Sequence, residues 1–311
     1  IPFSFCVYSR INAKAERNVI MKDLSITTPD RADLITHAGR FHADDVFATA
    51  LLSIILDKGL SLSRVTALPE ALPAKAIIYD IGCGELDHHQ IGGNGKHASG
   101  IPYAAFGLIW RKYGYAYCLS SFSDPDRAFS SFEGFVEGID AYDNGLYHEA
   151  DKSVMSISKC IGSFNPSWDN DAADAFDKAF IDAVGFAGKI IENQLSLIRS
   201  SLKAMDEICK AAETISNSTL ILERYMPVHE ILSIIKDLMI MIYPSLRGGF
   251  NIQILDGSMS FPENIRGVCP DSLHALTGIE SLNFVHNSGK LASTGTLDDA
   301  LLLRDLLFEQ K

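Results

Sequence analysis

The first hundred residues contain short apolar runs on either side of one amphipathic segment, and this order restricts the fold more than any other feature. Residues 33–39 (DLITHAG) predict a short buried strand that runs into a glycine turn, and residues 41–59 predict a helix with one apolar face. Two further strands are predicted at residues 63–68 and 74–84. A strand, helix, strand, strand order of this kind is typical of a parallel α/β sheet.

Polar side chains follow two of these predicted strands. His37 comes at the end of the first strand, and Asp80 follows the apolar run AIIY in the third. Ligands of parallel sheets bind beyond the carboxyl ends of the strands. A carboxylate such as Asp80, flanked by apolar residues, needs a partner when it is partly buried, and a cation is a natural one.

The rest of the chain predicts a helical middle and a second, smaller domain. Helices are predicted at 103–117 and 129–145, and one long helix or two shorter ones from Asp171 to about Thr214. After that, short strands alternate with turn residues, as in an α+β domain. The predicted divisions are an N-terminal extension (1–22), an α/β domain (23–170), a helical connector (171–214) and an α+β domain (215–311).

Composition narrows the classes of protein to consider. The net charge of −12 is not the basic footprint of a duplex-binding protein, although bound divalent cations would offset a site built from carboxylates. The six cysteines are scattered without a C-x-x-C pair, which argues against a structural zinc site or disulfide framework and favours a reducing, cytoplasmic setting. No apolar run approaches the roughly 20 residues that span a bilayer, so no membrane partner is expected. The basic residues of 1–22 leave a weak organelle presequence open.

Acids and imidazoles are concentrated in the predicted α/β domain, where five of the nine histidines fall between positions 37 and 97. Singly, each has a structural explanation: His37 could be a satisfied imidazole, and Asp44 or Asp45 could stabilise a helix N-terminus. Together they indicate a site of mixed imidazole and carboxylate ligands, which suits Mn²⁺, Co²⁺, Fe²⁺ or Zn²⁺ better than Ca²⁺. There are more candidate ligands than one ion needs, so we expect two ions.

Several motifs occur in the order found in one known family. These are HAGRFHADD (37–45), YDIG (79–82), DHHQ (87–90) and DAYDNG (140–145), followed by FNPSWDN, RGVCPDSL and FVHNSGKLASTGTLDDAL. The chain resembles the MYG-one family of the DHH phosphoesterase superfamily from about residue 33 to the C-terminus. The resemblance implies an N-terminal parallel-sheet DHH-type domain joined by a helical connector to a smaller α+β domain.

The same resemblance implies a metal centre that is bridged by Asp80. One metal ion would be held by His37, His42 and Asp80, and the other by Asp44, Asp80, His88 and an acid of DAYDNG, with Asp143 favoured over Asp140. His89 would face the substrate phosphate or act as an acid toward the leaving oxygen. Asp87 would orient an imidazole without touching a metal, and Asp45 could be a plain helix-start residue. The catalytic residues would be Asp80, His88 and His89, with Mn²⁺ the expected metal and Co²⁺, Fe²⁺, Zn²⁺ or Mg²⁺ the alternatives.

Substrate binding is expected from the segment HNSGKLASTG (286–295), which resembles the family's glycine-rich substrate-binding stretch. The residues concerned are His286, Ser288, Gly289 and Lys290, with Arg266 as a weaker phosphate contact. Without the resemblance, this segment would be interpreted as a β-turn that contains glycine. Trp168 in NPSW could offer a ring for base stacking, but a lone tryptophan is more often buried packing.

These features together predict a metal-dependent phosphodiester hydrolase that uses a metal-activated water. The resemblance implies a 3′→5′ exonuclease acting on single-stranded RNA or short oligonucleotides. A small-molecule phosphoesterase or pyrophosphatase is the alternative within enzymes. A non-catalytic, metal-stabilised binding scaffold is the alternative outside them. Homo-oligomer formation is left open.

Overall fold

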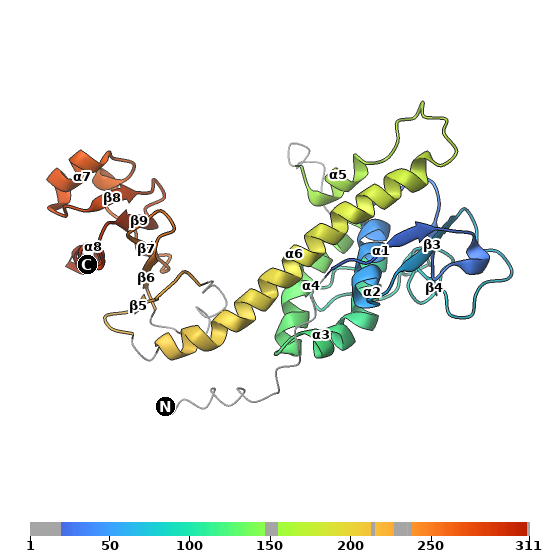
Figure 1. Cartoon of the computed structure of the whole chain (residues 1–311), viewed down its shortest axis with the longest axis horizontal. Helices are drawn as coiled ribbons and strands as arrows, with labels where there is room; N and C mark the ends of the chain where they lie inside the picture. The colour runs from blue at the N-terminus through green and yellow to red at the C-terminus, as the bar shows by residue number, and fades with distance from the viewer. Residues whose placement is uncertain (1–19, 147–154, 213–214, 227–234, 236–237, 310–311) are drawn as a thin grey trace. The chain divides into compact units, whose positions relative to one another are not determined.

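The structure is a computed structural model, and it describes residues 20–146, 155–212, 215–226, 235 and 238–309. The predicted extension at 1–22 therefore lies almost entirely outside the described residues. The chain divides into two compact units, and the division falls after Arg199, within the long helix α6 (Figure 1).

The first unit contains a parallel sheet with helices. Its strands are β1 (Leu24–Ile26), β2 (Leu34–His37), β3 (Leu60–Val65) and β4 (Ile77–Ile78). Its helices are η1 (Pro29–Arg31), α1 (Ala43–Ile55), α2 (Ala105–Ile109), the π-helical turn η2 (Trp110–Gly114), α3 (Tyr115–Ser121), α4 (Pro125–Asp143) and α5 (Ile157–Gly162). The strand order is β1-β3-β2-β4, and all three pairings are parallel. The predicted parallel α/β sheet is confirmed.

The third predicted strand is much shorter than its apolar letters suggest. Only Ile77 and Ile78 pair with β2. The backbone then enters the left-handed region at Asp80 (φ 55°), Gly82 (φ 86°) and Cys83 (φ 55°), so it cannot continue as an extended strand. The strand predicted at 63–68 begins earlier, at Leu60, and the edge strand β1 was not predicted.

The core of the first unit forms around α1, whose side chains are buried along nearly its whole length. Phe47 of α1 packs edge-on against Phe135, with ring centroids 5.4 Å apart. Trp110 is fully buried and stacks on Phe129, with centroids 5.0 Å apart. Because α1 is fixed by this aromatic packing, its N-terminal residues are held at the carboxyl end of the sheet.

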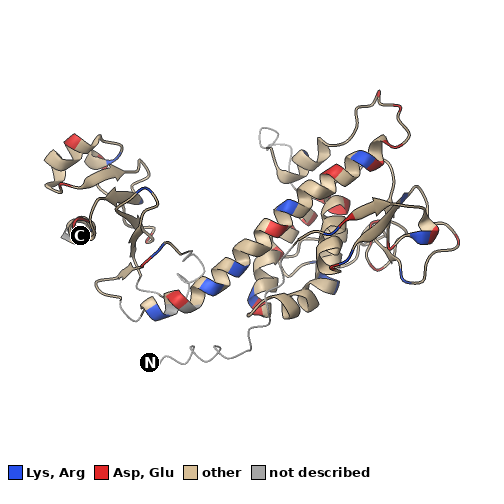
Figure 2. Ribbon diagram, viewed as in Figure 1, with Lys and Arg blue, Asp and Glu red and all other residues tan. Residues whose placement is uncertain are grey.

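The predicted helical connector is one uninterrupted helix, α6 (Ala175–Ala212). Its first half packs on the first unit, where Phe180 meets Phe41 edge-on and lies under the Arg64 guanidinium, 4.3 Å from its ring centroid. Figure 2 shows acidic and basic residues mixed along α6, with no basic stripe.

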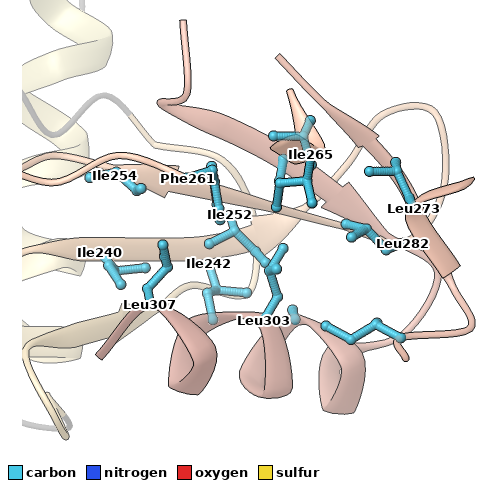
Figure 3. Close-up of a cluster of buried hydrophobic side chains, with 14 of the residues drawn as sticks. Ile240, Ile242, Ile252, Ile254, Phe261, Ile265, Leu273, Leu282, Leu303 and Leu307 are labelled. Carbon is cyan, nitrogen blue, oxygen red and sulfur yellow. The ribbon is translucent and has the colours of Figure 1, made fainter. Parts of the chain in front are cut away.

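The second unit is a mixed sheet with helices, as the predicted α+β class requires. Its elements are β5 (Thr219–Ile221), β6 (Ile240–Pro244), β7 (Phe250–Ile254), η4 (Glu263–Ile265), α7 (Pro270–Thr277), β8 (Leu282–Val285), β9 (Leu291–Thr294) and α8 (Leu297–Glu309). The strand order is β5-β6-β7-β9-β8. Figure 3 shows the apolar core, where Ile242 and Ile252 of the sheet lie near Leu303 of α8. Among the described residues, no helix is both long and apolar enough to cross a bilayer.

Candidate metal centre

A cavity of about 1000 Å³ lies at the carboxyl end of the parallel sheet. Its wall is built from the end of β2, the start of α1, the loop after β4, the end of α4 and part of α5. The titratable residues that line it are His37, Arg40, His42, Asp80, Cys83, Asp87, His88, His89, Tyr142, Asp143 and Lys159. The cavity is therefore at the edge of the sheet where the sequence predicts a ligand site.

Asp80 lies between two groups of possible ligands. Its side chain is buried, with Oδ2 3.3 Å from His37 Nε2 and Oδ1 3.7 Å from His88 Nδ1. Its left-handed backbone turns the carboxylate into the cavity at the point where β4 ends, and the Asp80 N–H donates to the Leu86 carbonyl (3.0 Å). Strained backbone of this kind is concentrated at functional sites. The two oxygens thus face different imidazoles.

His37 lies between two acids on the β2 side of the cavity. Its Nε2 is 3.2 Å from Asp45 Oδ2, in addition to its contact with Asp80. Burial alone would favour the neutral ring, but hydrogen bonds to Asp45 and Asp80 outweigh it and raise the pKa of His37 to about 10. Asp45 also accepts a hydrogen bond from the His42 backbone N–H (2.8 Å), which fixes the start of α1.

The other side of the cavity brings together Asp44, His88 and Asp143. His88 Nε2 is 3.1 Å from Asp143 Oδ2, and His88 Nδ1 is 3.8 Å from Asp44 Oδ2. The buried Asp44 carboxylate also accepts backbone N–H groups from Ala105 (2.8 Å) and Phe106 (2.6 Å) of α2. Burial, followed by the charges of Asp80 and Asp143, raises the pKa of Asp44 well above its usual range. A nearby cation would favour the ionised form.

The sequence DHHQ folds so that Asp87 holds His89. Asp87 Oδ1 accepts hydrogen bonds from the His89 backbone (3.1 Å) and from its ring Nδ1 (2.7 Å), while Oδ2 accepts the Cys83 N–H (2.6 Å). Burial opposes ionisation, but these hydrogen bonds outweigh it and lower the pKa of Asp87. The His89 ring stacks on His88, with centroids 4.2 Å apart, and more than half of its side chain is exposed.

The geometry of these side chains fits divalent cations. Three sets have potential ligand atoms within 4.8 Å of one another: Asp80–Asp87–His88–His89, His37–Asp45–Asp80, and Asp44–His88–Asp143. Two buried atoms in them have no hydrogen-bond partner among the described residues: Asp80 Oδ1 and His88 Nδ1. Such buried atoms are costly unless something satisfies them, and a cation bound by imidazole and carboxylate would do so.

Two predicted ligands, Asp140 and His42, belong to none of these three sets. The Asp140 side chain turns away from the cavity, because Oδ2 is 2.7 Å from His97 Nε2 and Oδ1 accepts the Gly107 N–H (3.1 Å). The structure thus places Asp143, and not Asp140, at the cavity wall. His42 lines the cavity, with its ring centroid 6.3 Å from that of His37, but it is exposed and is in none of the three ligand sets.

The predicted substrate residues of the second unit belong to a connected turn. Lys290 Nζ donates to the backbone carbonyls of Asp256 (2.9 Å), Gly257 (3.1 Å) and Met259, so its charge is held by the protein. Arg266 donates to the Phe261 carbonyl (2.7 Å) and lies against Gly289, which has a positive φ of 68°. His286 Nδ1 is 2.8 Å from Ser288 Oγ. The predicted role of this turn in substrate binding stays a prediction.

Two basic side chains at the cavity wall, Arg40 and Lys159, were not predicted from the sequence. Arg40 lies between β2 and α1; it is exposed and has no ion-pair or hydrogen-bond partner among the described residues. Lys159 lies in α5. Arg40 is part of the quoted motif HAGRFHADD, so its position next to His37 was available as a signal, whereas the letters around Lys159 carry none.

Comparison with known proteins identifies the family of this chain. The MYG1 exonuclease family model, which has the description "Uncharacterised protein family (UPF0160)", matches residues 33–306. This chain belongs to the MYG1 exonuclease family. The MYG1 protein C694.04c of Schizosaccharomyces pombe is 27% identical (86% of this chain, 94% of the relative), and the MYG1 protein YER156C of Saccharomyces cerevisiae is 26% identical (86% and 93%). The MYG1 exonuclease of Homo sapiens is 25% identical (89% and 85%). No solved structure matches the chain.

Membership of the MYG1 exonuclease family supports a nuclease or phosphoesterase activity, with a nucleic acid as the suggested substrate. The acid and histidine sets around Asp80 could bind metal ions. The resemblance to the MYG-one family is confirmed, and the match covers both units.

Metal binding should stabilise the fold. At a free Mn²⁺ concentration 100 times the dissociation constant, one bound ion adds about 2.7 kcal/mol to the free energy of unfolding. For a protein of this size we expect Tm to rise by roughly 4 °C for each bound ion in a thermal melt, and a chelator to reverse the rise. Asp80→Asn should lose most of this shift. An equal shift in that variant would show that the stabilising ions bind elsewhere.

Proposed function

We propose that the cavity binds two divalent cations, bridged by Asp80, and that the protein hydrolyses phosphodiester bonds as a 3′→5′ exonuclease on single-stranded RNA or short oligonucleotides. The observation that carries this proposal is the pair of Asp80 oxygens, one facing His37 and the other facing His88. This arrangement is the one that a carboxylate shared by two ions requires. The order of its motifs resembles that of the DHH phosphoesterases.

The chain's own residues suggest how the two ions would be divided. His37 and Asp80, with Asp45 or His42, would hold one cation, and Asp44, Asp80, His88 and Asp143 would hold the other. Bound divalent cations supply charge stabilisation at a phosphoryl group and make an attacking water more acidic. Manganese suits the mixture of imidazole and carboxylate ligands.

The remaining cavity residues provide substrate contacts. Arg40 and Lys159 place positive charge on the wall, where a phosphate would otherwise meet an acidic cavity. His89 is exposed toward the cavity and held by Asp87, so its ring can contact the phosphate or give a proton to the leaving oxygen. Asp87 acts through His89 as a positioning residue.

The test of this function is turnover of purified protein with Mn²⁺ on single-stranded RNA that is labelled at either the 3′ or the 5′ end. We expect the 5′-labelled strand to shorten stepwise and the 3′ label to be released as a mononucleotide. Release of the 5′ label first would show that cleavage runs in the 5′→3′ direction. Hydrolysis of pyrophosphate or cyclic dinucleotides alone would favour a small-molecule phosphoesterase. Bound metal without any phosphoester cleavage would favour a binding scaffold.

Asp87→Asn should lower kcat without removing the metal ions. The amide keeps the size of the side chain but no longer attracts the His89 ring as a charge, and loss of such an orienting carboxylate typically costs about 10–100-fold. Steady-state kinetics should show the fall in kcat, and thermal melts should still show the shift with Mn²⁺. Glu85→Gln is the matched control, because Glu85 is an exposed carboxylate in the same loop that pairs with Lys112. An unchanged kcat in Asp87→Asn would remove the positioning role.

A further inference from the structure

Trp168 is almost completely exposed, which is unusual for the largest apolar side chain. It is 95% exposed, whereas Trp110, the other tryptophan of the chain, is fully buried. Tryptophan is among the more deeply buried residues on average, because its ring removes a large apolar area from water. The expectation that Trp168 would be buried packing is therefore wrong, and its flat ring is free to stack on a ligand.

The loop that carries Trp168 is attached to the wall of the metal cavity. Figure 1 shows an open loop between α5 and α6. At its base, Asn165 Oδ1 accepts the Phe41 N–H (3.0 Å), and Asn165 Nδ2 donates to the Phe41 carbonyl (2.9 Å). Phe41 lines the cavity directly before His42. The loop is thus fixed by two hydrogen bonds to the segment that begins α1.

The loop has a defined turn at Trp168 itself. Ser167 Oγ donates to Asp169 Oδ1 (2.5 Å), and the Asn170 N–H donates to the Ser167 carbonyl (3.1 Å). Three peptide units separate Trp168 from Asn165, so their Cα atoms lie at most about 11 Å apart. An ordered turn therefore holds the Trp168 backbone within about 11 Å of Asn165, which is bonded to the cavity-lining residue Phe41.

We propose that Trp168 is a stacking platform for one unpaired nucleobase of the oligonucleotide whose end occupies the metal cavity. This inference rests on the proposed function, and it specifies the substrate as a short strand with a base beyond the reacting nucleotide. Base-on-aromatic stacking needs no cation and tolerates any base sequence.

The charges around Trp168 limit the substrate further. Asp169, Asp171 and Asp174 follow it in the loop, whereas Arg40 and Lys159 line the cavity. With the proposed metal ions bound, phosphates would be favoured at the cavity and disfavoured along the loop. A single stacked base fits this pattern, and a long strand that runs along the loop does not. We expect affinity to stop rising once the strand is long enough to reach Trp168.

Tryptophan fluorescence tests the proposal without any turnover. Iodide quenches an exposed indole and not a buried one, so the quenchable signal of this chain comes from Trp168. A short single-stranded RNA with phosphorothioate linkages, added with Mg²⁺, should protect Trp168 from iodide. An abasic strand of the same length should protect it far less. Equal protection by the two strands, or none by either, would overturn the proposal.

Variants separate stacking from a structural role. Trp168→Ala should weaken RNA binding roughly tenfold and raise KM while kcat stays close to that of the wild type, and Trp168→Phe should retain most of the affinity. Tyr225→Ala, at an exposed aromatic of the second unit, is the control and should change neither value. If Trp168→Ala binds RNA like the wild type, the proposal fails. Base-dependent protection without any RNA hydrolysis would instead remove the proposed function and keep the stacking site.

Discussion

Asp80→Asn should reduce phosphodiester hydrolysis by at least roughly a thousandfold, which corresponds to about 4 kcal/mol of lost transition-state stabilisation. The physical reason is the position of Asp80, whose two oxygens face His37 and His88. An amide has one oxygen and no charge, so it cannot serve both groups of ligands. The measurement is single-turnover cleavage of end-labelled RNA at saturating Mn²⁺, together with binding of Mn²⁺ by calorimetry.

A matched control distinguishes this effect from backbone strain. Asp57 also has a positive φ (49°), but it is exposed and pairs with Lys22 (3.2 Å). Asp57→Asn makes the same chemical change in the same backbone conformation, so it should keep full activity and full metal binding. If the Asp80→Asn protein retains wild-type cleavage, Asp80 does not bridge two catalytic ions.

Asp44→Asn should lose both activity and stability. The buried carboxylate uses its two oxygens for the N–H groups of Ala105 and Phe106, and it also faces His88. In the amide, one oxygen becomes an NH₂ donor that meets another donor, which costs about 1–3 kcal/mol of folding free energy. Loss of a charged ligand should lower kcat by at least roughly a hundredfold. Thermal melts with and without Mn²⁺, and cleavage assays, measure the two effects.

The control for Asp44 is an acid that caps a helix away from the cavity. Asp124 accepts the Arg127 N–H (3.0 Å) at the start of α4 and is partly exposed. Asp124→Asn should cost at most about 1 kcal/mol and leave the Mn²⁺-dependent rise in Tm intact. If both variants keep that rise, Asp44 has a structural role only.

The sequence could predict the fold class because the pattern and the packing agree there. The apolar run of 33–39 became β2, and the interruption at Asn144-Gly145 coincides with the end of α4. The helix predicted after β2 is present as α1, but the prediction of a single apolar face was wrong, because α1 is buried on all sides. The strand expected at 74–84 is short because its later residues have positive φ values. An apolar sequence pattern does not reveal that conformation. A three-residue edge strand such as β1 is too short to show the alternation of apolar and polar residues by which a strand is recognised.

The sequence indicated most residues of the candidate site, but not which of them contact one another. The order of acids and histidines indicated His37, Asp80, His88 and Asp143, which the fold brings to one cavity. The sequence could not show whether Asp45 is a possible metal ligand or a plain helix-start residue, because its closeness to His37 depends on how α1 packs against β2. The three-residue spacing of Asp140 and Asp143 hid which one His97 would hold, since that hydrogen bond joins residues far apart in the chain.

A two-ion centre bridged by Asp80 is tested most directly by the anomalous scattering of Mn²⁺ in crystals of this protein. We predict two peaks in the cavity, each within about 2.5 Å of an Asp80 oxygen. The same chain offers a competing cluster, His97–Glu133–Glu137, outside that cavity. A single peak at His97, or no peak within reach of Asp80, would contradict a two-ion centre at Asp80.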